Sequence, residues 1–177
     1  ILSIAIGVWA LSFVLSFTNG ITFTYIKNAI REQYSHLQIH QPEFEEDKNS
    51  KFVLENASGL LDSLRQMPEV EAVTSRSITM GMASTSRGAR GVQVIGIDPA
   101  GEAAVTGFDQ HLTEGDFLPE GKRNPILVSE RMAEKLKVKV RSKIVLTFQT
   151  LDGEITRASF RVSGLFKTGN MIIDEAV

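Results

Sequence analysis

The stretch "KIVLTFQTLDGEITRASFRVSGLF" (143–166) decides the fold, because apolar residues alternate on both sides of a turn. Strict alternation over several residues is typical of a strand with one buried face. Asp152–Gly153 stands between the two alternating runs and favours a tight turn. The pattern therefore predicts an antiparallel hairpin. Its inward-facing residues are Ile144, Leu146, Phe148, Phe160, Val162 and Phe166.

The segment before this hairpin predicts a short strand followed by a helix. Residues 126–128 are a continuous apolar run, and Ser129 after them is a favourable N-cap residue. The helical spacing after Ser129 would bury Met132, Ala133 and Leu136. Residues 100–125 hold four glycines and two prolines, so we expect a loop with one short helix there.

Further upstream, the periodicity predicts one helix and three more strands. Residues 53–67 have helical spacing and stop at Pro68, whereas 69–86 and 91–98 are extended, with a turn at 87–90. Residues 35–40 alternate and predict a strand that ends before Pro42, followed by a charged loop. The fold class predicted is α+β, a mixed α/β domain with antiparallel hairpins.

The first twenty-six residues differ from the rest because none of them is charged. Seventeen apolar residues rise about 25 Å as a helix, and all twenty-six rise roughly 39 Å, against about 30 Å of membrane hydrocarbon. The run therefore favours a membrane helix. A cleaved signal peptide and a buried core helix are the alternatives.

Helical spacing continues beyond the apolar run, and no Pro or Gly interrupts residues 21–34. We therefore expect one long helix that leaves the bilayer near Thr18–Gly20 and continues as an amphipathic stalk. The predicted organisation is a membrane helix and stalk at 1–34 and a globular domain at 35–177. We expect both ends of the chain to be cuts, the second one inside the domain.

Composition excludes several function classes. With 19 basic and 21 acidic residues the net charge is −2, which argues against a nucleic-acid partner. The absence of cysteine removes disulfides, cysteine–zinc sites and thiol catalysis. His36 and His40 could share a metal on a helix, but on the predicted strand they lie about 13 Å apart. We therefore expect no catalytic, cofactor-binding or metal-binding residue, and no enzyme.

Met80 and Met82 are the candidate substrate-contact residues. They fall on one face of the predicted strand. Two interpretations remain open. The methionines fill the core, or they form a soft apolar surface that accepts an acyl chain or varied hydrophobic ligands.

The segment "SIAIGVWALSFVLSFTNGI" (3–21) resembles the first membrane helix of FtsX/MacB-like ABC transporter permeases, most closely the lipoprotein-releasing type. The segments "LTEGDFLPEGKRNPILVSERMAEKLKVKVRSKIVLTF" (112–148) and "FRVSGLFKTGN" (160–170) are similar to later parts of the same family. Thr18 stands where the family usually has Met. Arg141–Ser142 stands where the family usually has Gly-Asp. These motifs are structural, and their order and spacing carry the resemblance.

The resemblance implies the first membrane helix and the MacB-like periplasmic core domain of a permease subunit in a bacterial inner membrane. The globular domain would lie outside the cytoplasm. Its implied partners are a cytoplasmic ABC ATPase, a second permease copy or paralogue, membrane lipid and a lipoprotein substrate. The chain would transmit work from ATP hydrolysis through the stalk and carry no cofactor. The alternatives are a membrane-anchored binding or sensor domain without an ATPase, and a tethered hydrolase that uses scattered acids.

Overall fold

The computed structural model describes residues 2–29, 35, 37–46, 51–151, 153–168 and 171–176. The chain divides into two compact units, Ile1–Gln38 and Ile39–Val177. The first unit contains one long helix, and the second contains a six-stranded sheet with short helices. An α+β fold with antiparallel hairpins is therefore confirmed.

Helix α1 spans Leu2–Ala29 and is apolar on all sides over most of its length. Its Leu2–Thr24 segment is long and apolar enough to cross a membrane, with a mean hydropathy of 1.7, and none of it is buried. The core-helix alternative is therefore wrong, whereas a signal sequence would meet the same criteria. The helical backbone passes Thr24 and reaches Ala29, and the rest of the predicted stalk, 30–34, lies outside the described residues.

The predicted strand at 35–40 is wrong. Residues 35 and 37–40 have no regular secondary structure, and His36 lies outside the described residues. Leu37 is 90% exposed and Ile39 is 54% exposed, so this alternation has no buried face to favour strand pairing. The short helix α2, Pro42–Glu46, follows where we expected a loop.

Helix α3 spans Ala57–Arg65 and is shorter than its periodicity predicted. Asn56 before it has φ 55°, a left-handed conformation that excludes the preceding residues from the helix. Leu60, Leu61 and Leu64 are only half-buried. The apolar face predicted from the spacing exists, but it covers little of the core.

The sheet has the strand order β2-β1-β5-β6-β3, and β4 also pairs with β6. All of its pairs are antiparallel except the parallel pair β4–β6. The strands are β1 Arg76–Thr85, β2 Gly88–Ile97, β3 Leu112–Gly115, β4 Pro125–Ser129, β5 Lys143–Gln149 and β6 Ile155–Phe166. The β5–β6 hairpin confirms the strongest sequence prediction, with Ile144, Leu146, Val162 and Phe166 each 1% exposed. The strand β3 was not predicted.

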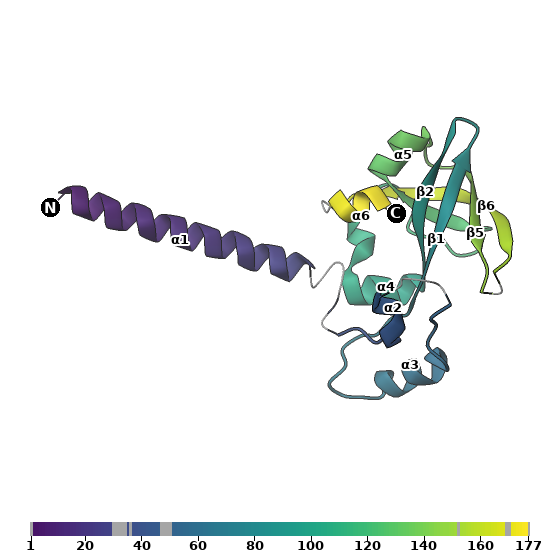
Figure 1. The fold of residues 1–177 in the computed structure, drawn as a ribbon, viewed down its shortest axis with the longest axis horizontal. Helices are drawn as coiled ribbons and strands as arrows, with labels where there is room; N and C mark the ends of the chain where they lie inside the picture. The colour runs from purple at the N-terminus through teal and green to yellow at the C-terminus, as the bar shows by residue number, and fades with distance from the viewer. Residues whose placement is uncertain are drawn as a thin grey trace. The chain divides into compact units, whose positions relative to one another are not determined.

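The remaining helices of this unit, after α2 and α3, are short, and α5 completes the core. They are α4 Pro99–Thr106, the 3₁₀ helix Phe108–His111, α5 Glu130–Leu136 and α6 Met171–Ala176. Met132, Ala133 and Leu136 of α5 are at most 3% exposed and belong to the same cluster as Ala83 and Val92 of the sheet. The helix start predicted at Ser129 is confirmed, because its hydroxyl accepts from the backbone N–H of Met132 at 3.1 Å. Figure 1 shows α5 and α6 beside β2.

The C-terminal helix α6 is held by polar contacts to the β4–α5 junction. The fully buried Ser129 donates its hydroxyl to the backbone carbonyl of Asp174 at 2.6 Å. The Asp174 carboxylate in turn accepts from the backbone and hydroxyl of Thr168, at 3.0 and 2.9 Å. Buried polar groups of this kind are satisfied inside the protein, which ties the end of β6 to α6.

Gly115 at the end of β3 cannot carry a side chain without disrupting the sheet. Its φ is +89°, and a Cβ there would lie 2.3 Å from the carbonyl oxygen of Ser163 on β6. We expect Gly115→Ala to lower the free energy of unfolding by about 2–4 kcal/mol, from left-handed strain and overpacking together. Urea denaturation followed by circular dichroism measures this change.

Gly121→Ala is the matched control for this prediction. Gly121 also has a positive φ, +75°, but a Cβ there would meet nothing within 4 Å. This control should cost about 1 kcal/mol, from strain alone. Equal losses for the two variants would show that the close approach to Ser163 is unimportant.

Candidate functional site

Met80 and Met82 lie on β1 with their side chains in solvent. They are 63% and 47% exposed, whereas their neighbour Ala83 is 3% exposed and belongs to the core. Successive side chains of a strand point to opposite faces, so burial of Ala83 places Met82 outward. The interpretation of these methionines as core filler is therefore wrong. Their role as substrate contacts stays a prediction.

The face around the methionines is open and carries both apolar and polar residues, and Met80 is paired with Gln93 on β2. Met82 is paired with Gly91 on β2 and with Thr147 on β5, and a Cβ at Gly91 would meet nothing within 4 Å. Val145, two residues before Thr147, lies on the same face and is 38% exposed. We call Met80, Met82 and Val145 the methionine surface. Flexible thioether side chains adapt to apolar ligands of irregular shape.

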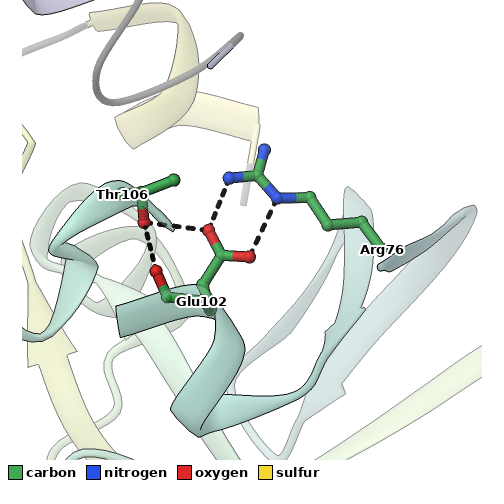
Figure 2. Close-up of polar contacts among 3 residues, drawn as sticks. All are labelled: Arg76, Glu102 and Thr106. Atoms are coloured by element: carbon green, nitrogen blue, oxygen red, sulfur yellow. Dashed lines mark hydrogen bonds and ion pairs between the residues drawn. The ribbon is translucent and has the colours of Figure 1, made fainter. Parts of the chain in front are cut away.

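An ion pair anchors the strand that carries the methionine surface, four residues before Met80. The Arg76 guanidinium at the start of β1 donates to both carboxylate oxygens of Glu102 on α4, at 3.0 and 2.5 Å (Figure 2). The Glu102 side chain is 3% exposed and that of Arg76 is 26% exposed. Bidentate pairing fixes the orientation of both groups as well as their separation.

Thr106 completes this network. Its hydroxyl lies 3.0 Å from a carboxylate oxygen of Glu102 and 2.8 Å from the Glu102 backbone carbonyl, as Figure 2 shows. The buried carboxylate therefore has partners on both oxygens. Because α4 directly follows β2, the Arg76–Glu102 ion pair links the start of β1, at the open end of the β1–β2 hairpin, to α4. Sequence reasoning missed this pair, whose members are twenty-six positions apart.

Three of the scattered acids that a hydrolase would need bond to nearby groups instead. Asp98 accepts from the backbone N–H of Gly101 and caps α4, and Asp174 accepts from that of Thr168. Asp116 forms an exposed ion pair with Lys122 at 3.1 Å. Among the described residues, no group of three or more His, Asp or Glu side chains could hold a metal ion. His40 lies 3.1 Å from the carbonyl oxygen of Gln41 through Nδ1.

A family model described as the MacB-like periplasmic core domain matches residues 1–177. The chain belongs to this family. No curated protein matches the chain. The resemblance to MacB/FtsX-like proteins, first seen in the apolar helix and in the segments around α5 and β6, is therefore confirmed at the level of the family.

Membership in the MacB-like periplasmic core domain family indicates a permease of the ABC transporter class. Together with α1, it indicates a membrane-anchored protein whose globular domain lies outside the cytoplasm. The family also implies a cytoplasmic ATPase partner. The methionine surface is the candidate site of this domain, because its apolar side chains are exposed to solvent.

Proposed function

We propose that this chain belongs to a permease subunit of the lipoprotein-releasing type in a bacterial inner membrane. Its domain couples ATP hydrolysis by a cytoplasmic partner to the handling or release of a hydrophobic substrate such as a lipoprotein. It acts as a dimer with a second copy or a paralogue. The chain itself catalyses no reaction and binds no cofactor.

The observation that carries the proposal is the exposure of Met80 and Met82 on an open sheet face. Exposed apolar groups in a row mark a contact surface more often than isolated ones do. Methionine is suited to acyl chains, because its three rotatable bonds adapt to a flexible ligand. The uninterrupted backbone of α1 from Leu2 to Ala29 supports the coupling, since a hydrogen-bonded rod transmits displacement.

The experiment is to purify the full-length protein with its native partners from membranes and to measure ATP hydrolysis. A permease gives vanadate-sensitive hydrolysis that a synthetic diacylated lipopeptide stimulates. A membrane-anchored sensor without an ATPase gives none, and that result would reject the proposal in favour of the sensor alternative.

The methionine surface gives a sharper prediction in the same assay. Met80→Asp with Met82→Asp should abolish the stimulation by the lipopeptide, because two charges on the surface penalise contact with an acyl chain. The melting temperature should stay close to that of the wild type, since both side chains are exposed. Glu114→Asp with Glu120→Asp, both on exposed residues, controls for surface substitution. Full stimulation of ATP hydrolysis in the methionine variant would show that Met80 and Met82 do not contact the substrate.

A further inference from the structure

The segment "KLKVKVRSK" (135–143) concentrates positive charge on one end of the domain. Leu136 is 1% exposed and Val138 is 9% exposed, and both pack into the core. The residues that alternate with them are all basic and all exposed: Lys135, Lys137, Lys139, Arg141 and Lys143. Burial of the apolar residues thus turns a row of cations toward solvent, in a chain whose net charge is −2.

Three basic side chains of this end line one cavity. The cavity has a volume of about 340 Å³ and lies between the β1–β2 turn, the end of α5 and the start of β5. Its lining consists of three cations, three hydroxyl residues and one valine: Arg87, Lys137, Lys143, Thr85, Ser86, Ser142 and Val138. No carboxylate lines it. We call it the basic cavity.

The three cations of the basic cavity have no carboxylate partner within the described part of the chain. Other basic residues of the same unit do have one: Arg65, Arg76, Lys122, Arg131, Lys135 and Lys167. Three like charges around one hollow repel one another, and a bound anion removes that repulsion. The hollow is therefore electrostatically matched to an anion.

Nearby acceptor groups are already engaged. The carbonyl of Leu136 at the end of α5 accepts from the hydroxyl of Thr85 at 3.2 Å, and that of Ala133 accepts from the N–H of Val138 at 2.9 Å. These carbonyls would otherwise present partial negative charge at the helix end. An adjoining hollow of about 460 Å³ shares Arg87, Lys137 and Val138 with the basic cavity and is also lined by Glu130 and Glu134. The side of the basic cavity away from these carboxylates is the one lined by Ser142 and Lys143.

The backbone of this segment also holds two cations in a costly conformation. Lys137 has φ 54° and Arg141 has φ 74°, the left-handed region that glycine adopts without strain. Each such residue costs roughly 1–2 kcal/mol.

We propose that the basic cavity binds a phosphate group, carried either by a phospholipid headgroup or by a small soluble phosphate ester. A phosphate monoester has up to two negative charges and a phospholipid phosphodiester has one, and both have strong acceptor oxygens that match the three cations and the hydroxyl groups of Ser86 and Ser142. The Thr85 hydroxyl already donates to the carbonyl of Leu136. A carboxylate has one charge and two oxygens, so it would leave more of the cavity unpaired than a phosphate monoester does. This site is separate from the methionine surface and goes beyond the proposed function.

The test uses the full chain in nonionic detergent and titration calorimetry with two probes, inorganic phosphate and dihexanoyl phosphatidylglycerol. The triple variant Arg87→Gln, Lys137→Gln, Lys143→Gln should weaken binding about tenfold or more, because three charge-assisted contacts are lost. The control Arg65→Gln, Lys122→Gln, Arg157→Gln changes the net charge equally but lies outside the cavity lining, and should change binding less than about twofold.

The two probes distinguish the sources. Tighter binding of the phospholipid identifies a headgroup, and equal binding identifies the phosphate group alone as sufficient. The proposal is overturned if neither probe binds below about 10 mM, or if both triple variants weaken binding equally. If the cavity variant fails to fold, the wild type is tested by chemical acylation of its lysines. Saturating phosphate should protect the amino groups of Lys137 and Lys143 from acylation but not that of Lys122. If phosphate does not protect Lys137 and Lys143, the proposal is also overturned.

Discussion

Replacing Arg76 by leucine should lower the free energy of unfolding by about 3–5 kcal/mol, because the Glu102 carboxylate is left buried and without its cation. Glu102 is 3% exposed and cannot regain water without displacing α4. For a domain of this size the loss corresponds to a melting temperature lower by on the order of 10 °C. Differential scanning calorimetry of the full chain in detergent measures it.

The reverse substitution provides the control. Glu102→Gln keeps an acceptor for Arg76, and the 26% exposed guanidinium can recover hydration, so this loss should be about half as large. The double variant Arg76→Leu, Glu102→Leu should be more stable than Arg76→Leu alone, because no charge is left unpaired. A double variant as unstable as Arg76→Leu would show that packing of the arginine side chain, rather than the stranded carboxylate, carries the effect.

Inserting Gly-Pro between Ile26 and Lys27 should reduce transport about tenfold or more while ATP hydrolysis and complex assembly persist. Proline removes a helical hydrogen bond and clashes with the preceding turn, at a cost of about 3 kcal/mol, so the helix breaks at the insertion. This prediction rests on the proposed permease function and on the continuous backbone of α1 through Ala29. It is measured by substrate release and ATP hydrolysis in proteoliposomes.

An Ala-Ala insertion at the same place is the matched control. It adds the same length and the same rotation but keeps the helix intact, because alanine has the highest helix propensity. Transport should therefore suffer more from Gly-Pro than from Ala-Ala. Equal transport in the two variants would show that an unbroken α1 helix is not needed to transmit work from ATP hydrolysis to the domain.

Local patterns in the sequence predicted the parts of the fold that depend on local physics. The β5–β6 hairpin and α5 follow from strict alternation and from an N-cap next to a helical period, and both place their apolar residues in the core. The strand at 35–40 failed because two alternating apolar residues do not establish a partner strand. Helix α3 was overextended because a period cannot reveal the left-handed Asn56.

Pairings between segments far apart in the chain could not be predicted from the sequence. β3 has four residues and gains its stability from β6, about fifty positions later, while β4 lies parallel to the same strand. The Arg76–Glu102 pair likewise joins elements that only the folded hairpin brings together.

The methionine surface could be predicted only in part. The sequence pattern placed both methionines on one face of the strand, but only the burial of Ala83 shows that this face points to solvent. The basic cavity left a visible signal, the alternation at 135–143, which sequence reasoning did not use.

Strand β6 has a consequence for how the domain moves. Its first half, up to Arg161, bonds to β5, and its second half bonds to β3 and β4. The two sets of bonds overlap at Arg161 and Val162: Arg161 is paired with Lys143 on β5 and with Pro125 on β4, and Val162 bonds through its backbone to Arg141 and Ser142. The two halves of the sheet therefore cannot hinge at the middle of β6 without breaking these bonds. Any displacement delivered to the domain would therefore move the sheet as a single block, and rearrangements during a work cycle would have to occur at its borders.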